Sequence, residues 1–334
     1  MDMSRLWQKG ASDAPLVSIN CITYNHARYI RQTLDGFFMQ ETSFPFEILL
    51  HDDASTDETQ AIVREYEERY PGVIHPIYQT ENQYSRGNTN INYMFNYTRA
   101  RGRYIAYCEG DDYWTDPHKL QKQVDYMEAH PECSLCFHAI LDVNDDGERI
   151  REFRAFSKSR TVGLAEILAG IRQYAFVSYM FRTEHIRNLP AFYFTCPVGD
   201  LPLTLILADR GSVYYMNDLM ACYRNAAAGS WTSRLHSGDS AAAKVHKHTL
   251  QMHEALQAFD DYTGGKYAAQ IAVGHEKLTF NELGCYREFR KLLAPKYRRF
   301  FKQMSLQVRL GTVAGALFPW LTPLLEKIYR RLIS

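Results

Sequence analysis

The sequence predicts an α/β fold in which a largely parallel sheet is covered by helices. In the first two hundred residues, short apolar runs alternate with helical patterns, which is typical of chains that build such a sheet. Two of the apolar runs, residues 46–50 and 104–108, shortly precede a pair of adjacent aspartates. With 334 residues, 46% of them hydrophobic, the chain can bury a full core and exceeds one typical domain.

The first elements follow from local signals. Residues 16–22 are the first expected strand, and Asn25 is expected to cap a helix over residues 27–39. After the strand at 46–50, Ser55-Thr56-Asp57-Glu58 has the spacing of a capping box and predicts that the next helix opens there.

The rest of the chain continues the alternation and then becomes helical. Further strands are expected at residues 73–78, 104–108, 135–143, 177–181 and 213–216. Helices are expected at residues 119–127, 164–168, 241–259 and 265–293.

Three polar clusters fall at the carboxyl ends of expected strands, where ligands collect in open α/β sheets. They are Thr23-Tyr24-Asn25, Asp52-Asp53 and Asp111-Asp112. Adjacent carboxylates suit a hydrated divalent cation, Mg²⁺ or Mn²⁺, that is shared with substrate phosphates. The alternative is that each aspartate only caps a helix or closes a turn.

Composition narrows the location and the chemistry. No apolar stretch precedes Pro15, so we expect no signal peptide and a cytoplasmic chain. The seven cysteines are scattered and are expected to be reduced, buried thiols, including the lone pair Cys133 and Cys136. The net charge is zero, but residues 286–334 carry eleven Lys or Arg against two Glu, a net charge of +9. Such asymmetry predicts a basic tail that meets an anionic surface.

Together, residues 17–25, 51–57 and 109–114 resemble the motifs of family 2 glycosyltransferases, which have the GT-A fold. The resemblance runs from about residue 15 to residue 235. Residues 113–123 resemble a bacterial subset that builds surface polysaccharides. We therefore expect an N-terminal tail at 1–14, a GT-A catalytic domain at 15–236 and a helical C-terminal region at 237–334.

The resemblance implies roles for the donor-side residues. Asp53 would contact the nucleobase, usually uracil, whose imide N–H a carboxylate can accept. Thr23 and Tyr24 would line the base pocket with Asn25 beside them. Asp111 would lie toward the ribose or the sugar, and Asp112 would bind the metal that bridges the diphosphate and assists departure of the nucleoside diphosphate.

Inversion at the anomeric carbon requires a general base for the acceptor hydroxyl. The family places this base after a short loop and before a helix, and Asp200 within residues 196–203 matches that position. From the residues alone, Asp200 is equally well explained as the N-cap of a helix over residues 202–208.

Further donor contacts are candidates. Residues 223–224 and 229–232 resemble the segment that closes over the diphosphate. Trp231 is a candidate donor-binding residue; it and Trp114 could stack on sugar faces or equally belong to the core. Arg86 is a candidate phosphate contact or a surface arginine in a polar loop. Many relatives carry a histidine after this Tyr-Arg pair, where this chain has residues 225–228 without one. His236 is a candidate substitute.

The basic C-terminal part suits a helix on an anionic membrane, because residues 291–309 mix six Lys or Arg with large apolar side chains. Residues 310–325 are uncharged but too short, and interrupted by two prolines, for a membrane span. The alternative is a set of helices that packs on the catalytic domain or on a dimer partner.

The sequence therefore predicts a metal-dependent, inverting hexosyltransferase that moves a sugar from a nucleotide donor, a UDP-sugar, to a saccharide or lipid-linked saccharide acceptor at the inner face of the membrane. Two other classes are weighed against it. A sugar nucleotidyltransferase normally needs a glycine-rich phosphate loop after the first strand, and residues 23–27 contain no glycine. A non-catalytic membrane scaffold would keep the fold without metal-dependent nucleotide binding. Nucleic-acid binding is not expected, because the basic residues lie in an apolar-rich tail.

Overall fold

The structure is a computed structural model that describes residues 14–170, 175–196, 198–225, 235, 238, 240–318 and 320. These residues form two compact units. Unit 1 contains the described residues within 1–163 and 172–227, and unit 2 contains those within 164–171 and 228–334.

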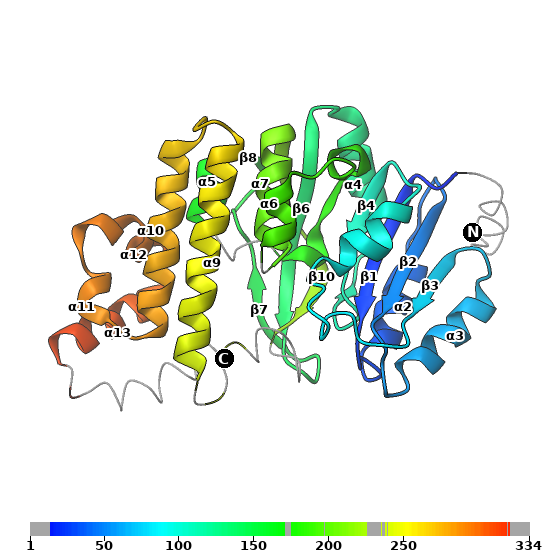
Figure 1. The fold of residues 1–334 in the computed structure, drawn as a ribbon, viewed down its shortest axis with the longest axis horizontal. Coiled ribbons are helices and arrows are strands. Elements are labelled where there is room, and N and C mark those ends of the chain that lie inside the picture. The colour runs from blue at the N-terminus through cyan, green and yellow to red at the C-terminus, as the bar shows by residue number, and fades with distance from the viewer. Residues whose placement is uncertain are drawn as a thin grey trace. The chain divides into compact units, whose positions relative to one another are not determined.

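Unit 1 is built on a ten-stranded sheet, whose strands stand side by side in Figure 1. The strands are β1 (Val17–Thr23), β2 (Phe46–Asp52), β3 (Ile74–Tyr78), β4 (Tyr104–Tyr107), β5 (Tyr113–Trp114), β6 (Cys133–Val143), β7 (Arg149–Phe153), β8 (Arg160–Val162), β9 (Met180–Arg182) and β10 (Ser212–Arg224). Their order is β3-β2-β1-β4-β9-β6-β10-β5, with β7 paired to β6 and β8 paired to β10.

The sheet has a parallel part and antiparallel insertions. Strands β3, β2, β1 and β4 are parallel, and so are β6 and β10. Strand β9 runs antiparallel between β4 and β6, and β5, β7 and β8 are also antiparallel to their partners. The predicted α/β architecture is confirmed, and the sheet is more mixed than we expected.

Helices and helical turns complete unit 1. They are α2 (Ile30–Phe38), α3 (Thr59–Arg69), the π-helical turn η1 (Asn92–Asn96), η2 (Tyr97–Arg99), α4 (Lys119–Ala129), η3 (Phe176–Ser178), η4 (Thr183–Ile186), α6 (Ala191–Thr195) and α7 (Asp200–Arg210). The core contains the inward faces of the strands together with α2, α3 and α4.

Two predicted helix caps are wrong. Helix α2 begins at Ile30 rather than after Asn25, and α3 follows Glu58 rather than opening at Ser55; the residues that directly precede the two helices form no side-chain cap. Asn25 and Ala54 have φ angles of 55° and 63°, a left-handed conformation that turns the chain before each helix. The side chains that resemble caps instead join the two loops, as described below.

Trp114 belongs to the core rather than to a sugar site. It is 2% exposed, its Nε1 donates to Val177 O at 3.1 Å, and the Nζ of Lys119 lies 4.1 Å from its ring centroid. Lys119 is itself fully buried, and burial lowers the pKa of its ammonium group to about 7.

Unit 2 is helical: α5 (Leu164–Ala169), α9 (Ala241–Tyr262), α10 (Ala268–Cys285), α11 (Phe289–Leu292), η5 (Pro295–Tyr297), α12 (Arg298–Gln303) and α13 (Leu306–Leu317). The expected single helix over 265–293 ends at Cys285, because Arg287 has a φ of 57°. No helix in the described ranges is long and apolar enough to cross a membrane.

The basic segment 291–309 is not one amphipathic helix. It is divided among α11, η5, α12 and the start of α13, and Leu292, Tyr297 and Phe300 are buried in the core of unit 2. Most of the apolar side chains that we expected on a membrane therefore stabilise the unit itself. The alternative, packing on the catalytic domain or on a dimer partner, stays a prediction.

Candidate active site

The loops that follow β1 and β2 are tied together by side-chain hydrogen bonds. The backbone N–H of Asn25 donates to Ser55 Oγ at 2.9 Å, and Asn25 Oδ1 accepts from the backbone N–H of Thr56 at 2.7 Å. Asp57 Oδ2 accepts from the backbone N–H of Ala27 at 3.0 Å. The residues that suggested helix caps in the sequence therefore fix two loops at the carboxyl edge of the sheet.

The acidic loop after β4 passes so close to the end of β1 that position 110 requires glycine. A Cβ at Gly110 would lie 2.6 Å from Thr23 Oγ1 and 2.9 Å from His26 Nδ1. Both of these atoms are buried, and neither has a hydrogen-bond partner among the described residues. Because buried polar atoms are almost always paired, two unpaired ones beside Gly110 single out this loop as a candidate functional site.

Glu109, to which sequence reasoning gave no role, opens this loop. Its Oε1 accepts from Tyr107 Oη at 2.8 Å. Burial, and next the charge of Asp111, raise the pKa of the Glu109 carboxyl to about 7, and Asp200 contributes in the same direction. In the sequence, the only signal for Glu109 was its position two residues before Asp111.

The two aspartates of the loop have different surroundings. The side chain of Asp111 is 13% exposed, and its Oδ2 lies 4.0 Å from His26 Nε2. Asp112 is 3% exposed, and its Oδ1 accepts from the backbone N–H of Arg224 at 2.8 Å. Burial and the charge of Asp111 raise the pKa of the Asp112 carboxyl well above its usual value.

Asp200 lies in the first turn of α7, where Gly199 precedes the helix. Its side chain is exposed, and its charge acts on Glu109 and on the phenol of Tyr193. The structure therefore brings Asp200 into the same electrostatic neighbourhood as the acidic loop, from a segment ninety residues further along the chain.

Arg224, at the end of β10, holds the acidic loop in place. It is 4% exposed, and its Nε donates to Asp111 O at 3.0 Å, in addition to the backbone contact with Asp112. Its Nη1 donates to Asp145 O at 2.9 Å, and its Nη2 donates to Gln32 Oε1 at 3.1 Å. The sequence suggested Arg224 beside the diphosphate, and the structure shows its guanidinium bound to protein oxygens.

The other predicted donor residues differ in their contacts. Asp53 is 5% exposed, and its carboxylate accepts from the backbone N–H groups of Gln83 and Tyr84 at 2.7 and 3.1 Å. Tyr24 is 42% exposed, so its ring is accessible. Arg86 forms a surface ion pair with Glu81.

Two predicted residues, Trp231 and His236, lie outside the described residues.

A divalent cation fits the chemistry of this loop. Within the described ranges, no group of three or more His, Cys, Asp or Glu side chains is placed to hold a metal. Asp111 and Asp112 nevertheless offer hard oxygen donors, and such cations often take one or two carboxylates together with phosphate and water. Burial first, and then the charge of Asp111, raise the pKa values of Glu109 and Asp112, and a cation would relieve the repulsion between these carboxylates.

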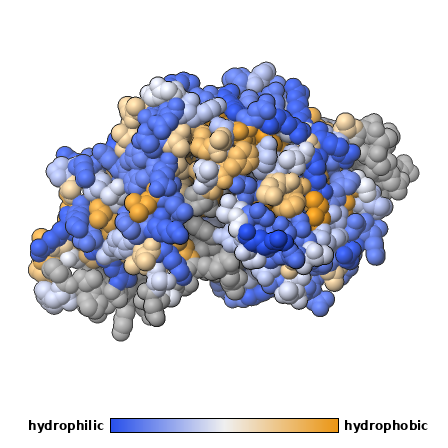
Figure 2. All heavy atoms as spheres, viewed as in Figure 1, coloured by the Kyte–Doolittle hydropathy of each residue, from blue (hydrophilic) through white to orange (hydrophobic). Residues whose placement is uncertain are grey.

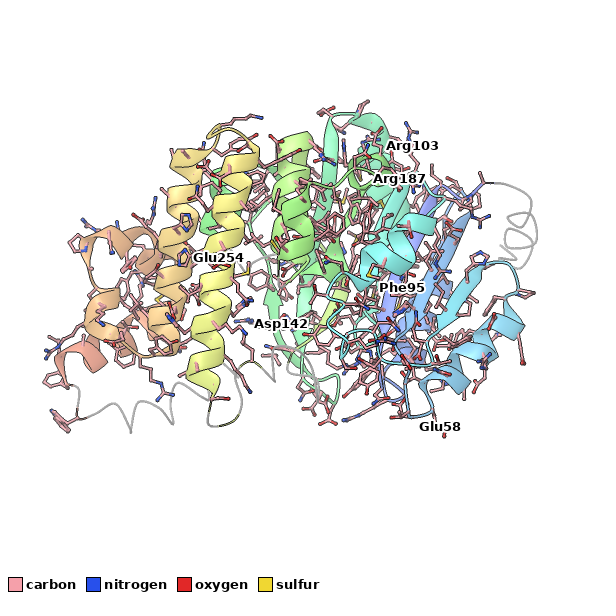
Figure 3. All side chains as sticks on the ribbon, viewed as in Figure 1. Glu58, Phe95, Arg103, Asp142, Arg187 and Glu254 are labelled. Atoms are coloured by element: carbon pink, nitrogen blue, oxygen red, sulfur yellow. The ribbon has the colours of Figure 1, made fainter. Side chains whose placement is uncertain are left out.

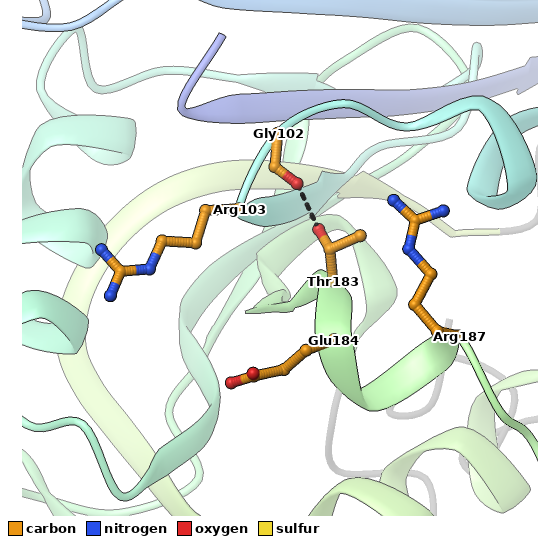
Figure 4. A pocket seen from close by; sticks show the side chains of 5 residues that line it. All are labelled: Gly102, Arg103, Thr183, Glu184 and Arg187. Carbon is orange, nitrogen blue, oxygen red and sulfur yellow. Dashed lines mark hydrogen bonds between the residues drawn. The ribbon is translucent and has the colours of Figure 1, made fainter. Parts of the chain in front are cut away.

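A hollow lined by Gly102, Arg103, Thr183, Glu184 and Arg187 lies elsewhere (Figure 4). It adjoins the amino end of β4, because Thr183 Oγ1 donates to Gly102 O just ahead of that strand. Figure 3 places Arg103 and Arg187 at one end of unit 1 and Glu58, which follows β2, at the other. This hollow is therefore remote from the carboxyl edge.

Comparisons with known proteins agree on one family. The model of "Glycosyl transferase family 2" matches residues 18–189. An uncharacterized protein of Mycobacterium tuberculosis is 40% identical over 221 residues, which are 65% of this chain and 61% of that protein. A Bacillus subtilis protein named as a teichuronic acid biosynthesis glycosyltransferase, TuaG, is 34% identical over 221 residues, 63% of this chain and 79% of that protein. The chain thus spans about 61% of the length of the mycobacterial relative.

One relative has a specific activity in its name. It is the Escherichia coli UDP-Glc:alpha-D-GlcNAc-diphosphoundecaprenol beta-1,3-glucosyltransferase WfaP, 33% identical over 114 residues, which are 34% of this chain and 42% of that protein.

Two solved structures share the GT-A fold. Staphylococcus aureus TarS 1–349 in complex with UDP has a TM-score of 0.54 at 16% identity and covers 95% of this chain and 88% of that chain. The mannosyltransferase PcManGT of Pyrobaculum calidifontis, in complex with GDP-Man and Mn²⁺, has a TM-score of 0.52 at 16% identity and covers 95% of this chain and 93% of that chain.

Proposed function

Because the chain belongs to glycosyltransferase family 2, we propose that it transfers a sugar with inversion from a UDP-sugar to a saccharide or lipid-linked saccharide of a bacterial surface polysaccharide. The observation that carries this proposal is the acidic loop with Glu109, Asp111 and Asp112 at the carboxyl edge of the sheet, close enough to Asp200 for its charge to help raise the pKa of Glu109. One carboxylate-rich loop and one exposed carboxylate from another helix are the parts that a metal-assisted displacement needs.

The proposed chemical step is a single displacement. The acceptor hydroxyl attacks the anomeric carbon of the donor, the bond from that carbon to the diphosphate oxygen breaks, and the nucleoside diphosphate leaves with the electron pair. Asp200 accepts the proton that the hydroxyl loses. Its exposure in the first turn of α7 leaves it accessible to an acceptor.

The chain's own residues prepare the diphosphate side. Asp111 and Asp112 would hold the cation, and a bound divalent cation neutralises charge on the leaving diphosphate. The partly exposed Asp111 is the more accessible of the two, whereas one oxygen of Asp112 already accepts from the Arg224 N–H. Arg224 fixes the loop that carries both side chains, which reduces the reorganisation required when the donor binds.

The choice of UDP rests on the accessible Tyr24 ring and on Asp53. Tyr24 can stack on a base, and Asp53 anchors the loop at residues 83–84 beside it while keeping further lone pairs for an imide N–H. TarS, a neighbour in fold, is solved with UDP, whereas PcManGT is solved with GDP-Man, so the base has to be measured.

The acceptor proposal rests on the relatives' names. WfaP is named for transfer to a sugar on diphosphoundecaprenol, and TuaG for teichuronic acid biosynthesis. A lipid-linked acceptor would place the enzyme at the inner face of the cell membrane.

The structural basis for such a location is one face of α13 in unit 2. Leu306, Leu310 and Leu317 recur at helical spacing and are each more than 60% exposed, and Trp320 beyond the helix is 75% exposed. Exposed basic side chains lie in the preceding segment, at positions 290, 291, 296, 298, 299 and 302. An apolar helix face near cations is typical of contact with an anionic bilayer.

Sedimentation with vesicles tests the membrane proposal. The wild-type chain should pellet with phosphatidylglycerol vesicles and not with phosphatidylcholine vesicles, and the double variant Leu306→Ser/Leu310→Ser should remain in the supernatant. Leu250→Ser, at a 49% exposed position on α9, is the matched control. Equal sedimentation of all three proteins would refute a role for α13.

A donor screen tests the central proposal. Nucleoside diphosphate release is measured across UDP-, GDP- and dTDP-sugars with a membrane lipid extract as the source of acceptor. Release from a UDP-sugar is expected for the wild type, and a loss of about 10³-fold in transfer for Asp200→Asn. Asp209→Asn, at the other end of α7, is the control and should retain activity. Normal transfer by Asp200→Asn would show that the base assignment is wrong.

A further inference from the structure

An aromatic cluster lies between η1 and α6, beside the candidate base. The Tyr93 and Phe194 rings are 4.9 Å apart and nearly perpendicular, and Tyr193 lies 5.3 Å from Phe194 and 6.4 Å from Tyr93. Part of the cluster faces solvent, because Phe194 is 38% exposed and the adjoining Met94 is 46% exposed. Figure 2 shows apolar side chains gathered on this face of unit 1, over α6 and over η1.

The η1 side of the cluster is connected to the acidic loop. Asn92 Nδ2 donates to Tyr107 Oη at 3.1 Å, and Tyr107 in turn donates to Glu109. Asn20 Nδ2, from β1, donates to Asn92 Oδ1 at 2.8 Å. This partly buried chain of hydrogen bonds fixes the turn that presents Tyr93 relative to the carboxylates.

The α6 side of the cluster is connected to Asp200. Asn90 Nδ2 donates to Phe194 O at 3.0 Å, which joins α6 to the segment before η1. The Tyr193 hydroxyl lies 3.6 Å from where a Cβ on Gly199 would stand, next to Asp200. Burial, and further the charges of Cys196 and Asp200, raise the pKa of Tyr193. The buried ring of Tyr193 thus lies next to the segment that carries Asp200, and the exposed ring of Phe194 packs against Tyr193.

The chemistry of this surface suits a saccharide. The C–H face of a pyranose is apolar and packs on aromatic rings, while its hydroxyl groups need hydrogen-bonding partners at the rim. The ring surface carries no charge of its own, so it offers little to a phosphate. Exposed aromatic surface of this kind is common where a monomeric protein binds a ligand.

We infer that Tyr93 and Phe194 form the subsite that holds the acceptor saccharide beside Asp200. This inference rests on the proposed glycosyl transfer and adds the place and the chemistry of the acceptor. The subsite binds the sugar rather than a lipid, and it acts on the acceptor without contributing to donor binding.

The test separates acceptor use from donor use. Phe194→Ala and Tyr93→Ala are assayed for transfer to a panel of p-nitrophenyl glycosides of glucose, galactose and N-acetylglucosamine and to a membrane lipid extract. Acceptor-free hydrolysis of the UDP-sugar is measured in parallel. Each variant should raise the acceptor KM about tenfold and leave the donor KM and acceptor-free hydrolysis unchanged. Tyr262→Ala, a 46% exposed aromatic position on α9, is the matched control, and thermal unfolding checks the folding of each variant.

Three outcomes would overturn the inference. An unchanged acceptor KM in both variants would remove the rings from the acceptor site. A parallel loss of donor hydrolysis would assign them to the donor, and loss of transfer only to lipid-linked acceptors would assign them to the lipid. If the wild type neither hydrolyses nor transfers any donor, the proposed function fails and this inference fails with it. If the wild type is active and one of the three outcomes is found, only this inference fails.

Discussion

Carboxylates at the two edges of the sheet in unit 1 have different partners. At the amino edge, Glu47 is 1% exposed and accepts from Ser18 Oγ at 2.6 Å, from Arg101 Nε at 2.7 Å and from the Arg101 backbone N–H at 2.9 Å. At the carboxyl edge, within the part of the chain that the structure describes, Glu109, Asp111 and Asp112 form no ion pair with lysine or arginine.

This difference distinguishes a carboxylate that stabilises the fold from carboxylates that are placed to bind a ligand. A carboxylate whose partners are all protein groups stabilises the fold, and removing it leaves those partners unpaired. Carboxylates that crowd together without a cation raise one another's pKa values and gain most from a ligand of opposite charge. Substitutions at the two edges should therefore change different observables.

The largest expected contrast is between Asp111→Asn and Glu47→Gln. Asp111→Asn should lower turnover by more than about 100-fold, because the donor complex needs this carboxylate. It should cause no loss of thermal stability, because it removes a charge that repels the neighbouring carboxylates. Glu47→Gln should cost about 2 kcal/mol of stability and keep the turnover of the folded protein. Urea unfolding and donor turnover at 25 °C measure both. Full activity of Asp111→Asn, or inactivity of a stable Glu47→Gln, would contradict the contrast.

Two glycines offer the next contrast. A Cβ at Gly102 would lie 2.5 Å from the backbone nitrogen of Ser18, whereas a Cβ at Gly110 would meet the Thr23 side chain. Gly102→Ala should therefore destabilise the fold by about 2 kcal/mol, since backbone must shift. Gly110→Ala should chiefly lower activity, by about tenfold or more, because the acidic loop moves. The comparison is wrong if Gly110→Ala is fully active.

Addition of a divalent cation should act at the carboxyl edge alone. Saturating Mn²⁺ with UDP should raise the Tm of the wild type by about 3 °C or more, as binding to the folded state does. Glu47→Gln should show the same rise and Asp111→Asn little or none. Differential scanning fluorimetry measures the shifts. An undiminished rise in Asp111→Asn would place the cation elsewhere.

The last expected effect concerns Lys119, the buried lysine that packs on the ring of Trp114. The pKa of Lys119 falls from 10.5 to about 7 on folding, so the fold favours its neutral form. The resulting penalty is full below pH 7 and decreases as the pH rises toward 10.5. Lys119→Met should therefore gain stability relative to the wild type at pH 6, and this advantage should shrink by roughly 2 kcal/mol by pH 9.

Exposed Lys122 on the same helix is the control. Lys122→Met should show no such dependence on pH, and a constant difference between Lys119→Met and the wild type would contradict the assignment.

The strands and the acidic loop could be predicted from local pattern, because apolar runs followed by Asp pairs are properties of adjacent residues. The caps at Asn25 and Ser55 could not, because the same side chains that cap helices also join loops. Whether such a side chain caps a helix or joins two loops depends on how the loops after β1 and β2 are placed, which no local signal encodes. Likewise, the apolar side chains of 291–309 indicated burial without showing that unit 2 itself, rather than a membrane, covers Leu292 and Phe300.

The site required tertiary information for its connections. The sequence suggested Arg224 as a ligand contact, yet its partners come from three separate segments of unit 1: the acidic loop, residue 145 and residue 32. Glu109 was overlooked because its significance comes from Asp111 and Asp200 together, and the distance to Asp200 depends on how α7 meets the sheet.

The placement of Tyr93 and Phe194 bears on how such an enzyme can diversify. Both rings are carried by η1 and α6, short helical segments outside the loops that hold Asp53, Asp111 and Asp112. On the inferred acceptor role of these rings, a mutation there would change which sugar is extended and leave the residues proposed for donor cleavage intact. New polysaccharide structures could thus arise from mutations in η1 and α6, while the residues proposed for donor cleavage stay unchanged.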